Sequence, residues 1–302
     1  MLAIIAPGQG SQTPGMFSSW IEEPSLKELL ISWSDAIGLD LLRLGTTADA
    51  DEIKDTANAQ PLIVAASLLG AHALGIKSFA ITSGHSVGEL AAAALAGAIT
   101  ESDALTLVRA RGVEMAKAAA ATPAGMSAVL GGDRAEVLAT LSSLNLVAAN
   151  DNGAGQIVAA GDLQALAQLG ENPPTGSRVR ALAVAGAFHT SFMSPAVEPL
   201  RALAATLTTH PVSIQVISNK DGQVVKDGAE VLDRIVNQIA NPVRWDLCME
   251  TLKSHGVTGV IELPPAGTLV GLLKRAAPEI ECFALKSADD LAAAREFAER
   301  HA

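Results

Sequence analysis

Apolar positions along this chain alternate between short continuous runs and longer stretches with helical spacing. Leu2–Ala6 is a short apolar run ended by Pro7 and Gly8, a pattern typical of a buried parallel strand. Phe79–Thr82 predicts a second strand of this kind. The surrounding segments predict helices at Leu26–Ile37, Pro61–Leu74, Val87–Ala96 and from Thr100 to about Ala120. Strands that alternate with helices predict a mainly parallel sheet covered on both faces.

Residues 124–186 have a different order of elements. Strands are expected at Met126–Leu130, Leu146–Ala149, Gln156–Ala159 and Arg178–Val184, and helices at Arg134–Leu144 and Leu163–Leu169. This β-α-β-β-α-β order is the split βαβ, ferredoxin-like unit. We therefore expect an α/β protein with a small ferredoxin-like domain at 124–186, inserted into a catalytic domain formed by 1–123 and 187–302.

The alternation of strands and helices resumes after residue 187. Helices are expected at about 192–207, 229–239, 244–254, 267–276 and 288–300, and strands at Val212–Ile217, Val257–Leu263 and Cys282–Leu285. The longest apolar run, Leu62–Ile76, contains Ser67 and His72 and is shorter than the roughly 18 residues of a membrane-spanning helix. It predicts a buried helix, with His72 as a core histidine.

Composition narrows the class of protein. Hydrophobic residues form 49% of the 302 residues and charged residues 18%, so the chain is too apolar to be disordered. Thirty-two acidic against 21 basic residues give a net charge of −11, which argues against nucleic-acid binding. Cys248 and Cys282 are too few for a disulfide framework, and no basic residue precedes Lys27 as in a secretory signal. We expect a cytoplasmic enzyme that binds neither nucleic acid nor membrane.

One glycine-rich motif carries candidate chemistry. Gly84-His85-Ser86-Val87-Gly88 matches G-x-S-x-G between a predicted strand and a predicted helix, the context of a nucleophile elbow. Such a turn lifts the serine oxygen to the carboxyl end of the sheet, and the helix that follows supplies N–H donors for an oxyanion. The alternative is an ordinary glycine-rich turn.

A serine nucleophile needs a base, and the chain has six histidines. His189 lies at a strand-to-helix junction of small residues and is the best candidate. His85 adjoins Ser86, and because neighbours on a tight turn point apart, a structural role is expected for it. Capping or solvated roles are expected for histidines at helix ends or the terminus, which are His210, His255 and His301.

Arg111 is unusual for its place on the predicted helix. Leu105, Val108, Gly112 and Met115 define the buried stripe of that helix, and Arg111 falls about 60° from the centre of the stripe at about 100° per residue. A guanidinium at the buried edge needs an anionic partner, because unpaired buried charge is costly. The partner is either an internal Glu or Asp, or a substrate carboxylate held by two hydrogen bonds.

Motifs along nearly the whole chain, from Leu2 to about Arg275, resemble one known family. They are Ala6-Pro7-Gly8-Gln9-Gly10-Ser11-Gln12, Gly84-His85-Ser86-Val87-Gly88-Glu89, Arg111-Gly112, Asn152 with Gly155-Gln156, His189, Gln238 with Asn241-Pro242-Val243, and Glu262 with Pro265 and Gly267. In this order they are similar to the malonyl-CoA:acyl carrier protein transacylases, the free-standing acyltransferases of type II fatty acid synthesis. The resemblance implies an α/β-hydrolase-like large domain with a ferredoxin-like insertion. Pro264 departs from the family pattern, which more usually has a glycine in that turn.

The resemblance also implies catalytic roles. Ser86 carries the malonyl ester, and His189 is its base and then the acid. The backbone carbonyl of Gln238 orients His189, in place of the acidic residue of a hydrolase triad. The backbone N–H groups of Gln9 and Val87 form the oxyanion hole.

Three further residues are implied to bind the substrate. Arg111 binds the malonyl carboxylate, and Asn152 lies in a motif of the family. Phe188 precedes His189 and is expected to limit the size of the acyl group. A phenylalanine there accompanies malonyl in related polyketide acyltransferase domains, where serine accompanies methylmalonyl. The alternative for Phe188 is packing between the two domains.

These roles imply a ping-pong transfer. Malonyl-CoA loads Ser86, and the phosphopantetheine thiol of holo-acyl carrier protein then takes the acyl group, with no metal or redox cofactor bound. A monomer is expected. The family's carrier is acidic, so a local basic patch is expected despite the net charge, with Lys274, Arg275 and Lys286 as candidates. Two alternatives remain open: a serine hydrolase or thioesterase with the same elbow, and a non-enzymatic carrier-binding scaffold.

Overall fold

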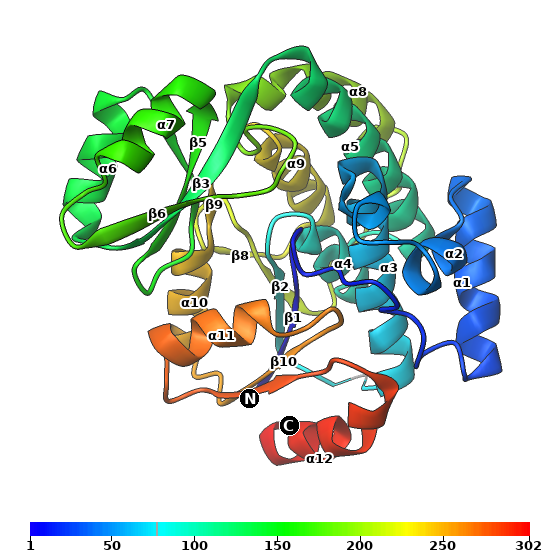
Figure 1. The fold of residues 1–302 in the computed structure, drawn as a ribbon. Coiled ribbons are helices and arrows are strands. Elements are labelled where there is room, and N and C mark those ends of the chain that lie inside the picture. The colour runs from blue at the N-terminus through cyan, green and yellow to red at the C-terminus, as the bar shows by residue number, and fades with distance from the viewer. Residues whose placement is uncertain (77) are drawn as a thin grey trace.

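The computed structural model describes residues 1–76 and 78–302 and contains two sheets with helices packed around them (Figure 1). The larger sheet has the strand order β11-β10-β1-β2-β7-β8. Its strands are β1 (Leu2–Ala6), β2 (Ile81–Gly84), β7 (Gln215–Ile217), β8 (Val224–Val225), β10 (Gly259–Glu262) and β11 (Glu281–Ala284). All neighbours are parallel except β7 and β8.

Side chains of β1 alternate between two hydrophobic cores, as the two faces of a strand require. Leu2, Ile4 and Ala6 face the core that contains α3 (Thr56–Leu74), α4 (Gly88–Leu95) and α5 (Glu101–Ala121). Ala3 and Ile5 face the core built with α10 (Trp245–Ser254) and α11 (Thr268–Ala276). Helices therefore cover both faces of the sheet, which explains why this strand is apolar throughout. The remaining helices of the larger part are α1 (Pro24–Ile37), α2 (Leu41–Thr46), α8 (Ser194–Ala204), α9 (Gly228–Gln238) and α12 (Leu291–His301).

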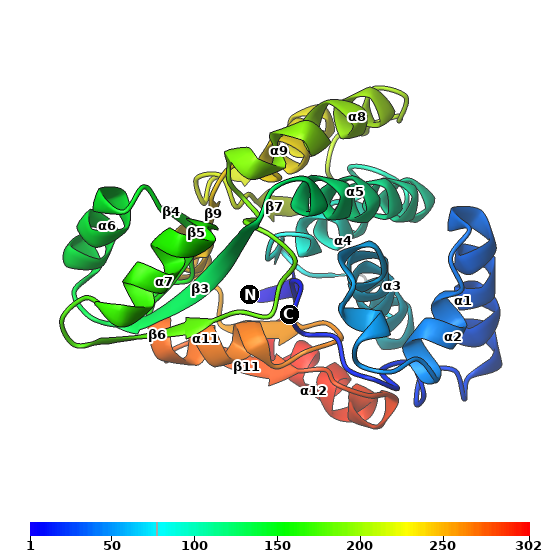
Figure 2. The ribbon, with the colours of Figure 1, turned by 45° about the horizontal axis from the view of Figure 1, so that its top comes forward.

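The smaller sheet has the order β6-β3-β5-β4-β9 and lies beside the carboxyl end of β1 and β2 (Figures 1 and 2). Its strands are β3 (Ala124–Gly131), β4 (Val147–Asp151), β5 (Gln156–Asp162), β6 (Ser177–Ala181) and β9 (Val243–Arg244). One face packs on α6 (Arg134–Ser143) and α7 (Leu163–Glu171). The edge strand β9 pairs in parallel with β4 and comes from the segment just before α10. The small sheet is thus tied to the larger part by hydrogen bonds as well as by chain connections.

The expected α/β class is confirmed, with both sheets of mixed strand direction, and most predicted elements form within a few residues of their expected ends. The second strand begins two residues later than predicted, at Ile81, and the strand expected at Val212–Ile217 is ordered as β7 only from Gln215. Thr100 and Asp103 form the capping box that opens α5. The short elements α2, β8 and β9 were not predicted.

Helix α3 begins at Thr56, five residues before the predicted start, and carries Pro61 inside it. Proline has no N–H, so the carbonyl of Ala57 loses its helical partner. Arg109 of α5 supplies one, because its Nη1 donates to the Ala57 oxygen at 2.9 Å. This replacement allows the helix to continue through the proline and fastens α3 to α5.

Two histidines differ from the sequence prediction. His72 is not a core residue: it lies at the exposed edge of α3, where its Nε2 is 2.9 Å from both carboxylate oxygens of Glu101. His301 is buried rather than solvated, since α12 packs against β10 at Gly259 and brings the imidazole onto Thr258 Oγ1. In the described residues, α3 has the length and apolarity of a spanning helix, but 72% of its apolar 18-residue window is buried inside the molecule.

Candidate active site

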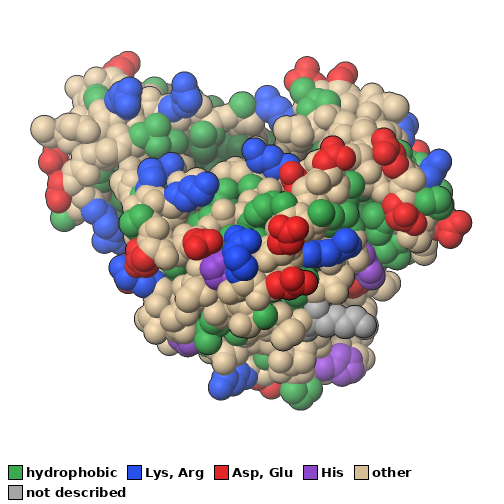
Figure 3. Space-filling view, turned by 90° about the horizontal axis from the view of Figure 1, so that it is seen from below, with side chains coloured by type: hydrophobic (Ala, Val, Ile, Leu, Met, Phe, Trp, Pro, Cys, Tyr) green, Lys and Arg blue, Asp and Glu red, His purple; other side chains and the backbone are tan. Residues whose placement is uncertain are grey.

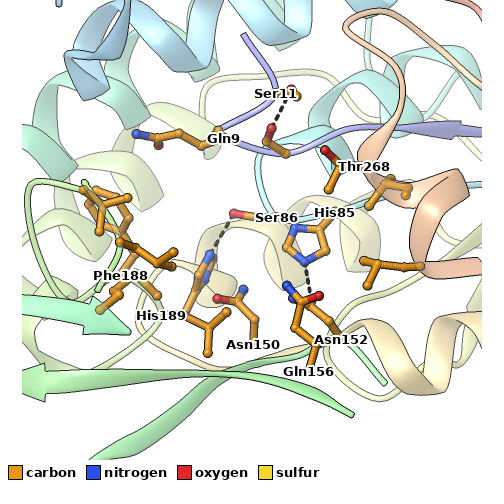
Figure 4. Close-up of a pocket in the computed structure, with 18 of the residues that line it drawn as sticks. Gln9, Ser11, His85, Ser86, Asn150, Asn152, Gln156, Phe188, His189 and Thr268 are labelled. Carbon is orange, nitrogen blue, oxygen red and sulfur yellow. Dashed lines mark hydrogen bonds between the residues drawn. The ribbon is translucent and has the colours of Figure 1, made fainter. Parts of the chain in front are cut away.

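The G-x-S-x-G segment forms a sharp turn between β2 and α4. Ser86 has φ 53°, a left-handed conformation that costs energy for any residue with a Cβ. The glycines at 84 and 88 permit the turn: a Cβ on Gly84 would overlap the Gly88 backbone, and one on Gly88 would overlap the Ala6 carbonyl. The serine oxygen therefore points into a pocket at the carboxyl end of the larger sheet, where Figure 4 shows it.

His189 lies opposite Ser86, as the sequence predicts for a base. Its Nε2 is 2.7 Å from Ser86 Oγ (Figure 4), and its Nδ1 is 2.8 Å from the backbone oxygen of Gln238. A carbonyl oxygen only accepts, so Nδ1 must carry the proton and Nε2 must have the free lone pair. The serine hydroxyl then donates to Nε2, which is the arrangement that a general base requires.

Burial holds His189 neutral. Removal from water and the positive charge of Arg111 together lower the pKa of the imidazole to about 3, against the opposing effect of its hydrogen bond to the Gln238 oxygen. His189 also has positive φ, at 61°, and its backbone N–H donates to the Ile239 oxygen. The imidazole is thus a fixed, uncharged acceptor at ordinary pH.

Two backbone N–H groups beside Ser86 have no acceptor. Over residues 1–76 and 78–302, the N–H groups of Gln9 and Val87 donate to no protein atom, whereas that of Ser86 is taken by Asn219 Oδ1 at 2.8 Å. Val87 precedes the first residue of α4, so its N–H also lies at the positive end of the helix dipole. Two free donors near a nucleophile match the requirement for an oxyanion hole.

Arg111 reaches the same place from α5 and is only 1% exposed. Its Nη1 donates to Gln60 Oε1 at 2.7 Å, and its Nη2 to Gln238 Oε1 at 3.0 Å and to Ser86 Oγ at 3.5 Å. Its Nε has no partner in the described structure. Burial lowers the pKa of Arg111 to about 10, while the charge of Glu89 opposes this. No carboxylate of the described residues forms an ion pair with it within 4.0 Å, so the internal salt bridge is absent.

The pocket has a volume of about 200 Å³. Ser86 and His189 line it, as do the predicted residues Gln9, Asn152 and Phe188, whereas Arg111, Val87 and Gln238 lie behind its wall. One wall comes from the face of the small sheet opposite α6 and α7. Apolar side chains close the pocket around Phe188, namely Met115, Met126, Val158, Leu182 and Val184.

His85 points away from Ser86 and joins the turn to the small sheet. Its Nε2 is 2.9 Å from Oδ1 of Asn152, just beyond β4 (Figure 4), and its ring meets that of Trp245 edge-on. This is the structural position expected for His85. Asn152 therefore contributes both to the pocket wall and to the contact between the two parts of the molecule.

Three functional residues were not singled out from the sequence. Gln60 holds Arg111, Asn219 holds the Ser86 N–H, and Glu89 accepts hydrogen bonds from Asn219 and Gln238. Gln60 precedes the predicted helix start at Pro61, so no sign in the sequence placed it within α3. Glu89 stands in the serine motif itself. Asn219 follows a short strand, and no local pattern marks it.

Comparisons with known proteins agree with this geometry. The acyl transferase domain family matches residues 4–295. The malonyl CoA-acyl carrier protein transacylase of Mycobacterium tuberculosis (strain ATCC 25618 / H37Rv) is 53% identical over 296 residues, which cover 96% of this chain and 98% of that protein. The crystal structure of MCAT from M. tuberculosis superposes with a TM-score of 0.95 and covers 98% of this chain and 99% of that one.

A further solved structure holds a type II PKS acyl-carrier protein in complex with its malonyl-transacylase. It is 28% identical, has a TM-score of 0.91, and covers 98% of this chain and 99% of that chain. The matched span of the family, residues 4–295, is nearly the whole chain and contains the positions of Ser86, Arg111 and His189. The chain therefore belongs to the acyl transferase family that includes the malonyl CoA-acyl carrier protein transacylases.

Proposed function

We propose that this enzyme transfers a malonyl group from malonyl-CoA to the phosphopantetheine thiol of an acyl carrier protein. The names of its relatives and the complex of a related malonyl-transacylase with its carrier support this proposal. The observation that carries it is the buried guanidinium of Arg111, whose Nη2 lies 3.5 Å from Ser86 Oγ with only neutral partners. Such a group is suited to a substrate that carries a second carboxylate.

The first half-reaction loads the enzyme. Ser86 Oγ attacks the thioester carbonyl while its proton passes to His189 Nε2, and the N–H groups of Gln9 and Val87 receive the oxyanion. When the tetrahedral intermediate collapses, the C–S bond breaks and His189 returns the proton to the CoA sulfur. The Gln238 backbone carbonyl keeps the imidazole in the tautomer that both proton transfers need. It also stabilises the imidazolium that forms between them.

The second half-reaction reverses these roles with a new thiol. His189 takes the proton of the phosphopantetheine thiol, whose sulfur attacks the Ser86 ester. The ester C–O bond then breaks, and the proton returns to Ser86 Oγ. Atoms and charges balance without a metal or redox group.

Arg111, Phe188 and Asn152 are proposed to select and hold the acyl group. The guanidinium binds the malonyl carboxylate, and the apolar wall around Phe188 limits substitution at the carbon between the two carbonyls. Asn152 lines the pocket through a side chain already fixed by His85. Together these residues define a small pocket with one cationic end.

The chain is proposed to form two domains, one that holds the reacting residues and one that closes the pocket. Residues 1–123 and 187–302 form an α/β-hydrolase-like domain with the nucleophile, base and arginine, and residues 124–186 form a ferredoxin-like domain that closes the pocket. The carrier is proposed to dock at basic side chains near the pocket mouth, including Lys274 and Arg275. The enzyme is proposed to act as a cytoplasmic monomer.

The serine hydrolase alternative gains no support, because His189 Nδ1 is bound by a backbone carbonyl rather than by a carboxylate. Intact-protein mass spectrometry separates the two functions. After mixing with malonyl-CoA, the enzyme should carry one malonyl adduct that persists in buffer and disappears when holo-acyl carrier protein is added. An adduct that water discharges as fast as the carrier does would instead identify a hydrolase.

A further inference from the structure

Glu89 is a buried carboxylate that the reaction steps above leave unused. It lies in the first turn of α4, three residues after Ser86, and is 3% exposed. Its Oε1 accepts the backbone N–H of Asn219 at 2.6 Å, and its Oε2 accepts Gln238 Nε2 at 2.6 Å. Both partners are donors, so the side chain serves as a double acceptor.

The amide of Gln238 can lie in only one orientation. Its Nε2 is surrounded by three acceptors: Glu89 Oε2, Asn219 Oδ1 at 3.0 Å and the Ser86 backbone oxygen at 3.2 Å. An oxygen in that position would face three others, so the hydrogen-bond network fixes which end of the amide is which. The Gln238 oxygen is therefore left to face Arg111 Nη2.

We propose that Glu89 is a positioning residue for malonyl recognition, acting through the Gln238 amide on Arg111. The inference rests on the proposed function, since it assumes that Arg111 holds the malonyl carboxylate. The Gln238 amide lies between two groups that favour the same orientation. Its N–H donates to Glu89, which accepts hydrogen bonds at both oxygens although burial raises the pKa of this carboxyl to about 8, and its C=O accepts from the Arg111 guanidinium. Glu89 thus acts on Arg111 through the Gln238 amide, without touching the guanidinium.

An amide between Glu89 and Arg111 has a consequence that a direct ion pair would lack. A carboxylate in contact with Arg111 would satisfy the guanidinium and compete with the substrate. The Gln238 and Gln60 carbonyls instead hold the guanidinium in place while leaving its positive charge uncompensated by direct contact. The site is therefore prepared for a carboxylate that only malonyl supplies.

The substitution Glu89→Gln tests this relay with almost no change in shape. A glutamine at 89 has one oxygen and one NH2, so it cannot accept from both donors. The Asn219 N–H belongs to the backbone and cannot turn, so the new oxygen stays with it and the new NH2 faces Gln238. The Gln238 amide must then turn, and Arg111 loses its fixed carbonyl.

We expect the ratio of specificity constants for malonyl-CoA over acetyl-CoA to fall about tenfold or more, the effect of losing a hydrogen bond to a charged group. The matched control is Glu262→Gln. Glu262 is another buried carboxylate, but it accepts backbone N–H groups of Gly267, Leu269 and Val270 at the start of α11. This control should lower the melting temperature and leave the malonyl-to-acetyl ratio unchanged.

Each outcome decides a separate point. In the double variant Glu89→Gln with Arg111→Ala, the ratio should equal that of Arg111→Ala alone, because no guanidinium remains to position. If Arg111→Ala lowers the ratio and Glu89→Gln does not, the positioning role is wrong and the proposed function stands. If Arg111→Ala leaves the ratio unchanged, Arg111 does not hold the malonyl carboxylate, and this part of the proposed function is wrong together with the inference.

A purely structural role for Glu89 predicts equal losses for malonyl and acetyl with the ratio retained, and that result overturns the inference. Should Glu89→Gln not fold, Glu89→Asp provides the same readout. Aspartate keeps the carboxyl group, which can accept at both oxygens, but withdraws it by one methylene from the Gln238 amide, so the ratio should fall by less than in Glu89→Gln. An unchanged ratio in a folded Glu89→Asp enzyme would count against the relay.

Discussion

At the scale of single residues, the site combines charges and dipoles that water cannot screen. Ser86, His189 and Arg111 are each almost fully buried, and each is held by a neutral carbonyl or amide. Neutral partners fix geometry without cancelling charge, so the full charge of Arg111 remains for the substrate. Arg111 Nη2 lies 3.5 Å from Ser86 Oγ, close enough for the nucleophile and the carboxylate-binding group of the proposed function to engage one acyl group.

Arg111→Ala should impair loading by malonyl-CoA far more than loading by acetyl-CoA. A malonyl carboxylate left unpaired in the desolvated pocket costs about 2–5 kcal/mol, which corresponds to a loss of about 30-fold or more. Acetyl has no carboxylate, so the variant imposes no such free-energy cost on acetyl loading. Single-turnover loading rates for the two thioesters measure the difference, and equal losses would assign Arg111 a structural role.

Phe188→Ser should raise methylmalonyl transfer relative to malonyl. Phe188 lines the pocket beside His189 and is 5% exposed, so an added methyl group meets a formed apolar wall. Overpacking costs about 1–3 kcal/mol, so the wild-type preference for malonyl should be about 5- to 150-fold. Competition between the two thioesters measures the ratio, with circular dichroism as the folding control. A folded variant with an unmoved ratio would make Phe188 a packing residue.

Residues with a local signature were predictable, and those defined only by tertiary contacts were not. The serine turn has a glycine pattern because the chain crossing excludes a Cβ there. Arg111 was visible as a cation at the edge of an apolar stripe, but its partners Gln60 and Gln238 come from α3 and α9, which no spacing in the sequence relates. Asn219, which holds the Ser86 N–H, lies in the turn after β7, and the sequence of that turn has no recognisable motif.

At the scale of elements, the close packing of α3 on α5 carries Arg111 to the nucleophile. Gly112 lies at the closest approach: a Cβ there would be 2.9 Å from the Thr56 oxygen and 3.2 Å from Ala57 Cα. The carbonyl freed by Pro61 accepts Arg109 at the same crossing. A small residue beside the arginine therefore permits its burial.

Gly112→Ala should destabilise the protein, although alanine is the better helix former by about 1 kcal/mol. The new methyl group forces the helices apart, at a cost of about 1–3 kcal/mol that exceeds the gain. The matched control is Gly271→Ala in α11, where nothing lies within 4 Å of the new Cβ, and it should stabilise the protein slightly. Thermal unfolding of both variants tests the contrast. A rise in melting temperature for Gly112→Ala would contradict this packing.

Hydrophobic periodicity predicted most of the helices and strands that are present, but it did not predict several of the residues at which they begin and end. Strands of two residues such as β8 and β9 are too short for any alternation to register. Helix α3 was predicted to start at Pro61 because proline interrupts helical hydrogen bonding. The sequence could not reveal that Arg109 donates to the Ala57 carbonyl, which the proline leaves without a helical partner. Long-range hydrogen bonds thus decided the features that local pattern missed.

At the scale of the whole molecule, the distribution of charge matters more than its sum. The net charge is −11, yet Figure 3 shows a notch between two lobes with Lys and Arg more frequent on the small-sheet side. Lys274 and Arg275 are exposed in the last turn of α11, the helix whose first turn lines the pocket. Among the described residues neither forms an ion pair, so both are free to meet an acidic partner.

Lys274→Glu with Arg275→Glu should slow transfer to holo-acyl carrier protein about tenfold at low salt, as loss of electrostatic steering does. Transfer to free pantetheine, which has no acidic surface, should be unaffected. Lys27→Glu with Lys226→Glu changes the net charge equally at exposed sites on α1 and after β8, and serves as the control. Equal effects of the two pairs on carrier transfer would place the docking surface elsewhere.

The central claim is that Ser86 carries the acyl group, and peptide mapping of the loaded enzyme tests it most directly. The protein is mixed with malonyl-CoA, digested and examined by tandem mass spectrometry beside the Ser86→Ala variant. The wild-type enzyme should carry malonyl on Ser86 alone, and the variant should carry none while keeping the wild-type fold. A malonyl adduct that persists in Ser86→Ala, or maps to another residue, would contradict the account.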